Sequence, residues 1–253
     1  MSCKIVPALA LLLVAGVASA TDITSSYTFE ASGTNTGGAT VDAKAQLTLD
    51  FTNFTLTLTL TNLLSNPNSV GQNITDFDFQ LLSSGHTINP GCTAANCLTS
   101  AVAPSTVSVA KGGGYTVHNT PVDPQWAFSL NSGVFTLDGL AGGHNPAYSI
   151  IGPPGGATYS NAAGSIAGNG PHNPFINQTA TWTFNIPNLA TGVTPGHVVF
   201  SFNTTSGDLF SCDSDPMHCE SVPPSSVPEP SALVLIGSGL IGIGFLRKRQ
   251  RRS

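Results

Sequence analysis

Basic residues are almost absent from the middle of this 253-residue chain. Between residues 21 and 228 there is no arginine, and the lysines are limited to Lys44 and Lys111. The same stretch carries twelve acidic residues against those two lysines, a formal net charge of −10. Binding of nucleic acid or of anionic membranes needs clustered Lys and Arg. We therefore expect neither activity from this part of the chain.

Long amphipathic helical patterns are also missing. The clearest periodicity is the strict Leu/Thr alternation over residues 56–61, which is typical of a half-buried β-strand. Just before it, Leu47, Leu49 and Phe51 alternate in the opposite phase. A change of phase moves the apolar side chains to the other face of a strand, so we predict a tight hairpin or a bulge at residues 52–53.

Further strands are predicted from similar alternation, separated by turn residues. They lie around residues 74–81, 126–130, 134–137, 179–186 and 197–203. Alternation with one polar face is typical of antiparallel sheets that are wet on one side. We predict an all-β body, an antiparallel β-sandwich or jelly-roll-like domain over residues 21–220. Residues 139–174 are rich in Gly, Pro, Asn and Ser, and we interpret them as long ordered loops or as a boundary between two lobes.

Four cysteines belong to this body, Cys92, Cys97, Cys212 and Cys219. Four cysteines in an exported protein allow three pairings. The short spacings favour two local disulfides, Cys92–Cys97 and Cys212–Cys219. A zinc site is the alternative, but neither spacing is the C-x₂-C that structural zinc sites use most often.

The first twenty residues have the features of a secretory signal peptide. Lys4 precedes an apolar stretch over residues 7–17, and Ala18-Ser19-Ala20 fits an A-x-A cleavage site. We therefore expect the mature chain to begin at Thr21. Cys3 precedes the apolar stretch, which argues against lipid attachment at a cysteine.

The last residues combine a rigid motif, an apolar segment and a basic cluster. A Pro/Ser linker over residues 221–227 leads to Pro228-Glu229-Pro230, where the prolines hold the backbone extended. The uncharged run 231–246 would span about 24 Å as a helix, short of a hydrocarbon core of about 30 Å. Positive charge beside a span stays on the cytoplasmic side, so we expect the body to be outside the cytoplasm. The basic stop comprises Arg247, Lys248, Arg249, Arg251 and Arg252.

This arrangement resembles the PEP-CTERM sorting signal of Gram-negative bacteria. The motif residues Val227, Pro228, Glu229 and Pro230, the Gly-rich apolar run and the basic stop occur in the order typical of that signal. We accordingly assign residues 228–253 to a sorting signal that contains a transmembrane segment at 231–246. The resemblance implies an exosortase-like membrane enzyme as partner, transient retention in the inner membrane, and delivery to the cell surface or an exopolysaccharide matrix.

Cofactor sites are poorly supported. Gly237, Gly239 and Gly242 fit the G-x-G-x-x-G fingerprint, but that site needs a βαβ unit and a later acidic residue, for which the remaining chain is too short. The acidic loop with Asp213, Asp215 and Glu220 is a candidate Ca²⁺ site, because Ca²⁺ takes six to eight oxygen ligands. A solvated acidic loop is the alternative, and we expect no other cofactor.

We find no catalytic motif and expect a non-enzymatic body. Asp76 and Asp78 share one side of a predicted strand, and a polar outer face opposite Phe77 and Phe79 explains them without catalysis. A secreted hydrolase is one alternative. The other is a polysaccharide-binding sandwich, whose candidate stacking rings are Tyr115, Trp126, Tyr148 and Tyr159, with core packing as the competing interpretation of Trp126.

Overall fold

The Leu/Thr alternation forms the centre of a five-stranded antiparallel sheet, sheet A. The computed structural model describes residues 23–143, 147–204 and 208–211 of the protein. Leucine side chains of the alternating strand are fully buried, and its threonines are half-buried on the opposite face. In spatial order sheet A contains β1 (Thr24–Thr34), β2 (Thr40–Asp50), β3 (Thr55–Asn62), β13 (Thr179–Asn185) and β6 (Leu98–Val102).

The predicted change of phase is a tight turn between β2 and β3. Asp50 ends β2, and its Oδ1 accepts hydrogen bonds from the backbone N–H groups of Thr52 and Asn53, both at 2.9 Å. Its Oδ2 accepts a third from Asn53 Nδ2 at 2.7 Å. These bonds, with the Asn53 side chain first, lower the pKa of Asp50. The hairpin predicted at residues 52–53 is confirmed.

A second sheet, sheet B, is centred on β4 (Ile74–Ser83), which pairs with four other strands. Its main path runs β15 (Asp208–Ser211), β14 (Val193–Phe202), β4, β11 (Ile150–Ile151), β12 (Phe175–Asn177), β7 (Thr106–Val109) and β8 (Tyr115–His118). Off this path, β10 (Val134–Asp138) joins β4 to β9 (Ala127–Asn131), and β5 (His86–Thr87) pairs with β4. The pair β11–β12 is parallel, a departure from the purely antiparallel body that we expected.

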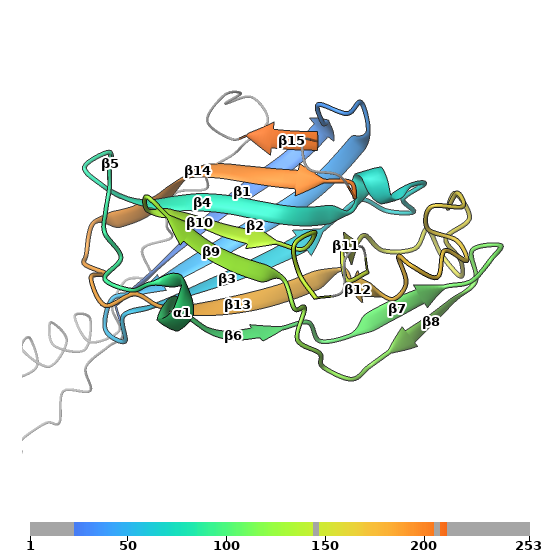
Figure 1. Cartoon of the computed structure of the whole chain (residues 1–253). Coiled ribbons are helices and arrows are strands. Elements are labelled where there is room, and N and C mark those ends of the chain that lie inside the picture. Colours follow the sequence, from blue (N-terminus) through green and yellow to red (C-terminus); the bar gives the residue numbers. More distant parts are fainter. Residues whose placement is uncertain (1–22, 144–146, 205–207, 212–253) are drawn as a thin grey trace, which may run out of the picture. The chain divides into compact units, whose positions relative to one another are not determined.

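The inner faces of the two sheets share one hydrophobic core, the main core. Figure 1 shows β4, β9 and β10 of sheet B in front of β2 and β3 of sheet A. Phe184 of β13 contacts Phe79 of β4 and Phe135 of β10, with ring centroids 6.2 and 5.8 Å apart. Trp126 and Trp182 pack together at 5.1 Å. The body is therefore β-sandwich-like, as predicted.

The Gly/Pro-rich segment 139–174 is ordered where the structure describes it, and it covers a small separate cluster. This second core contains residues of the short helix η1 (Val70–Gln72), β7 and β12, together with three side chains from the segment itself, one of them in β11. Tyr159 is 1% exposed, and its hydroxyl donates a hydrogen bond to the carbonyl oxygen of Gly152 at 3.0 Å. The buried residues of the second core are Val70, Val107, Val109, Ile151, Tyr159, Ile166 and Phe175.

Several predicted segments lie outside the described residues. They are the signal peptide at 1–20, the linker at 221–227, and the sorting signal at 228–253 with its apolar run. In the part of the chain that the structure describes, no helix has the length and apolarity needed to cross a membrane.

Candidate functional site

Two aspartates face each other across neighbouring strands of sheet B. Asp76 of β4 and Asp138 of β10 are direct partners in the antiparallel register. A hydrogen bond between their side chains favours the protonated form of Asp76. We call these two residues the carboxyl pair.

Backbone groups of the following turn hold the carboxyl pair in place. Asp138 Oδ1 accepts hydrogen bonds from the N–H groups of Leu140 at 2.8 Å and Ala141 at 2.7 Å. Asp76 Oδ1 accepts one from the N–H of Gly139 at 3.1 Å. A Cβ on Gly139 would lie 2.8 Å from a ring atom of Trp126, so the turn is packed too closely to admit a side chain there.

Burial and like charge both oppose ionisation of Asp76. Desolvation, then the hydrogen bond and the negative charge of Asp138, raise its pKa to about 7. Asp78 is two residues further along β4, and its pKa is raised mainly by desolvation, with a hydrogen bond from Thr136 acting in the opposite direction. Neither lysine of the body lies in β4, β9, β10 or β14 to offset these charges.

The carboxyl pair can exchange a proton near neutral pH, but its geometry fits a structural role. A glycosidase needs two carboxyl groups separated by about 5 Å or more, whereas these two are hydrogen-bonded. Phe77 and Phe79 are fully buried on the inner face, as predicted, with Asp76 and Asp78 on the other. Sequence reasoning missed Asp138, whose one available signal was its place at the end of a strand before Gly139.

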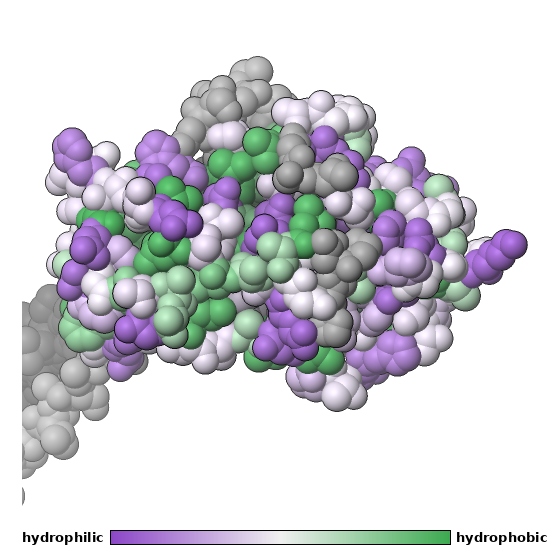
Figure 2. Space-filling model, viewed as in Figure 1, coloured by the Kyte–Doolittle hydropathy of each residue, from purple (hydrophilic) through white to green (hydrophobic). Residues whose placement is uncertain are grey.

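Figure 2 shows the face of the molecule over β4, β9 and β10. Hydrophilic and hydrophobic residues are interspersed across it and no single class dominates. The partly buried side chains of Phe128 and Leu130 lie against the main core from β9. This face of sheet B is therefore mixed in polarity.

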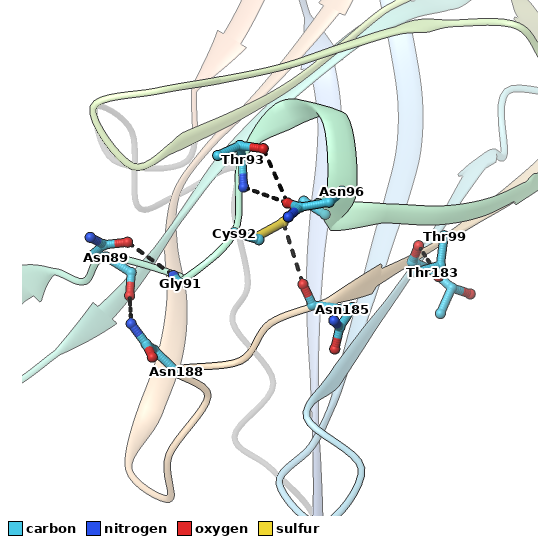
Figure 3. Close-up of a disulfide and its surroundings, with 10 residues drawn as sticks. Asn89, Gly91, Cys92, Thr93, Asn96, Thr99, Thr183, Asn185 and Asn188 are labelled. Carbon is cyan, nitrogen blue, oxygen red and sulfur yellow. Dashed lines mark hydrogen bonds between the residues drawn. A yellow bond between two sulfur atoms is a disulfide. The ribbon is translucent and has the colours of Figure 1, made fainter.

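The predicted disulfide Cys92–Cys97 is confirmed, with an S–S distance of 2.04 Å. It closes the loop that leads into the short helix α1 (Ala94–Cys97). Figure 3 shows the disulfide beside β13, where Cys97 Sγ lies 3.5 Å from the carbonyl oxygen of Asn185. Asn188 Nδ2 donates to the carbonyl oxygen of Asn89 at 3.1 Å. Because both sulfurs are bonded to each other, they are not available to zinc.

The four aromatic side chains selected as stacking rings are not all available to a ligand. Trp126 is 6% exposed, and its Nε1 donates to the carbonyl oxygen of Tyr148 at 2.9 Å. Tyr159 is buried in the second core, where Tyr115 packs edge-on against it at 5.5 Å. Trp126 and Tyr159 are therefore core residues, and the prediction of loop rings at these two positions was wrong.

The candidate calcium ligands Asp213, Asp215 and Glu220 lie outside the described residues, as do Cys212 and Cys219. Within residues 23–143, 147–204 and 208–211, no three His, Cys, Asp or Glu side chains are grouped so as to hold a metal ion.

Comparison with known proteins gives information on the C-terminal end of the chain. Neither a curated protein nor a solved structure matches the chain. Residues 226–250 match the family model described as the PEP-CTERM protein-sorting motif. This match covers the motif residues 227–230, the apolar run and part of the basic stop. The motif implies export, sorting to the cell surface and processing by an exosortase-type membrane enzyme, and the chain carries this PEP-CTERM protein-sorting motif at residues 226–250.

Proposed function

We propose that the chain is a non-enzymatic protein of the cell surface or the exopolysaccharide matrix. The observation that carries this proposal is the PEP-CTERM motif at residues 226–250. The apolar run 231–246 holds the exported chain in the inner membrane until an exosortase-type enzyme processes it near residues 227–230. The β-sandwich body is then released to the surface.

Two properties of the body support an extracellular location. The disulfide Cys92–Cys97 is of the kind that persists in oxidising compartments. Loss of the sorting signal also removes five of the eight basic residues of the chain. The released body is strongly acidic, and a net charge far from zero favours solubility and opposes self-association.

The proposal is tested by following the chain in a host that has an exosortase. Deletion of residues 227–253 should abolish surface delivery, and mass spectrometry of the wild-type protein should find a new C-terminus near residues 227–230. A host without the sorting enzyme should retain the uncut chain in its inner membrane. The proposal fails if the deleted chain reaches the same location or if wild-type protein stays in the cytoplasm.

A matched pair of substitutions separates the motif from general effects of charge. Glu229→Gln changes the acidic residue between the two prolines, and we expect uncut protein to accumulate. Glu30→Gln removes an acid from the exposed surface of β1 and should leave processing unchanged. Equal processing of both variants would show that Glu229 is not read by the enzyme.

A secreted hydrolase is the second candidate, and the carboxyl pair is the observation that favours it. A pKa near 7 for Asp76 is suited to proton transfer at neutral pH. Turnover of a glycan or ester substrate by the protein, abolished by both Asp76→Asn and Asp138→Asn, would establish this activity. If the protein turns over no glycan or ester substrate, the carboxyl pair has only the structural role of accepting hydrogen bonds from the turn at residues 139–141.

A polysaccharide-binding sandwich remains the third candidate. Of the four rings selected from the sequence, Trp126 and Tyr159 are buried, and Tyr115 and Tyr148 are half-buried. Retention of the protein on the host's own exopolysaccharide, lost on Tyr148→Ala, would favour it. No retention on that polymer would exclude it.

A further inference from the structure

Threonine occupies the outer face of sheet A in a regular two-dimensional pattern. On β3 the outward positions are Thr55, Thr57, Thr59 and Thr61, and all are half-buried. On the neighbouring β13 the outward threonines are Thr179, Thr181 and Thr183. We call these seven residues the threonine array.

The register of the strands aligns these hydroxyl groups in rows across the sheet. One row crosses all five strands, because each of its members is the direct partner of the next. Within the rows, Thr59 and Thr181 hydroxyls are 3.0 Å apart, and those of Thr61 and Thr179 are 3.4 Å apart. The five-strand row consists of Ser26, Thr48, Thr57, Thr183 and Ser100.

The spacing of the array is set by the sheet itself. Neighbouring strands are about 4.8 Å apart, and side chains on one face recur about every 6.8 Å along a strand. Threonine is β-branched and stiff at χ1, and the hydrogen bonds within the rows restrict the hydroxyls of Thr59 and Thr181 further. Because each strand is rotated relative to the next by the twist of the sheet, a flat surface can contact only neighbouring strands at one time. The array meets this condition, since β3 and β13 are neighbours.

The array carries no charge and no ring. Charged side chains on the outer face of sheet A lie on β1 and β2, where Glu30 and Lys44 are direct partners. Tyr27 of β1 packs against the main core, so no aromatic ring of these five strands is on the outer face. A charged polymer has no counter-charge on the array, and a sugar has no stacking surface there.

We propose that the threonine array binds the surface of crystalline water. Ice is an uncharged lattice that repeats in two directions at spacings close to those between strands and between alternate residues. Each threonine presents a hydroxyl that can bond a lattice water and a methyl that is cheap to dehydrate. This binding goes beyond surface delivery, although an exported protein is placed where extracellular ice forms.

The test uses the full-length chain in non-ionic detergent micelles. Ice is grown slowly from a solution that also contains empty micelles and an unrelated marker protein, and the protein content of the ice is measured. We expect the wild-type chain to be enriched in the ice relative to the marker and to slow recrystallisation of small ice grains. Exclusion of the wild-type chain at the level of the marker overturns the proposal, even if surface delivery is confirmed.

Substitutions then locate the surface. Thr59→Tyr with Thr181→Tyr places two rings in the centre of the array and should abolish enrichment, because the lattice can no longer approach. Thr116→Tyr makes the same change at an exposed threonine of β8 and should retain it. Near-UV circular dichroism checks the fold, and Thr59→Lys offers a second disruption if the double variant does not fold. Enrichment of a folded array variant equal to the wild-type level overturns the assignment.

Discussion

The main core and the second core are stabilised by different kinds of structure. The main core draws its large side chains from long strands in two facing sheets, with Trp182, Phe184 and Phe200 all fully buried. The second core has seven buried residues, and they come from short strands, η1 and the segment 139–174. The first is assembled by periodic sequence, and the second by individual contacts at turns.

Contacts around Tyr159 illustrate this second type of assembly. Its N–H donates to the carbonyl oxygen of Gly113 at 2.8 Å, in the turn between β7 and β8. Gly113 has a φ of +84°, and a Cβ there would collide with the carbonyl oxygen of Tyr159. Nearby, Asn173 Oδ1 accepts from the N–H of Val109 at 2.7 Å, so side-chain amides also hold this region together. We expect the second core to open without the first.

The largest expected effect is on the main core. Trp182→Ala removes a fully buried ring from β13 and should lower the free energy of unfolding by about 3–5 kcal/mol. Chemical denaturation measures this loss. Because Trp182 packs against Trp126 across the sandwich, amide protection should fall in both sheets.

Thr183→Ala is the matched control on the same strand. This side chain is half-buried on the outer face, and its removal should cost well under the loss for Trp182→Ala. Equal losses for the two variants would contradict the placement of Trp182 in the main core.

The next effect concerns the second core alone. Tyr159→Ala should reduce the free energy of local opening by about 3 kcal/mol, because a buried ring and its hydrogen bond to Gly152 are lost. Hydrogen exchange should quicken in β7 and β12, while β3 and β13 stay protected. Loss of protection throughout sheet A would show that the two cores open together.

Tyr159→Phe separates the ring from the hydroxyl. It keeps the packing against Tyr115 and removes the hydrogen bond to the carbonyl oxygen of Gly152. We expect a local loss of about 1 kcal/mol. A loss as large as that of Tyr159→Ala would mean that the hydroxyl, and not the ring, holds this core.

The two cores also differ in how much of each could be predicted from the sequence. Strands β3, β4, β10, β13 and β14 were predicted because large apolar residues alternate along them. Strand β1 was not predicted, because its inward positions include Ser25 and Ala31, which give a weak apolar signal. The composition of the second core was not predictable either, since its contacts join turns that are distant in sequence.

The candidate site divides in a similar way. The sorting motif is contiguous, so its residues can be read directly from the sequence, and the match at 226–250 confirms it. The local disulfide Cys92–Cys97 was predictable from its short spacing. The carboxyl pair was not, because it depends on which strand lies beside β4 and in which register.

The disulfide Cys92–Cys97 is a covalent contact within a single loop. Replacing both Cys92 and Cys97 with serine opens a six-residue loop and should lower the free energy of unfolding by about 2 kcal/mol in the chain-entropy model. Thermal unfolding with and without reductant measures it. Reductant should lower the melting temperature of the wild-type protein by more than that of the double variant, in which Cys212–Cys219 is the predicted disulfide that is left. An equal response in both would assign the effect to cysteines other than this pair.

A further effect of small size is the pH dependence due to Asp76. Its folded-state pKa of about 7 is above the ordinary value of 3.8, so the folded state binds the proton more tightly than the unfolded state does. The free energy of unfolding should therefore fall as pH rises from about 4 to 7, by roughly 1–2 kcal/mol after allowance for partial exposure. Asp76→Asn imitates the protonated form, keeps an acceptor for the N–H of Gly139, and should remove this slope.

Asp50→Asn is the control with the opposite sign. Hydrogen bonds at the β2–β3 turn lower the pKa of Asp50, so its contribution is present at neutral pH and is lost as pH falls below its ordinary value. The variant should be less stable than wild type at pH 7 and keep the slope between pH 4 and 7.

Carboxyl carbon NMR of Asp76 follows the titration directly, and its pKa should fall in Asp138→Asn because a like charge has been removed. A pKa of Asp76 that is unmoved by Asp138→Asn would mean that burial alone, and not the paired carboxyl, holds its proton.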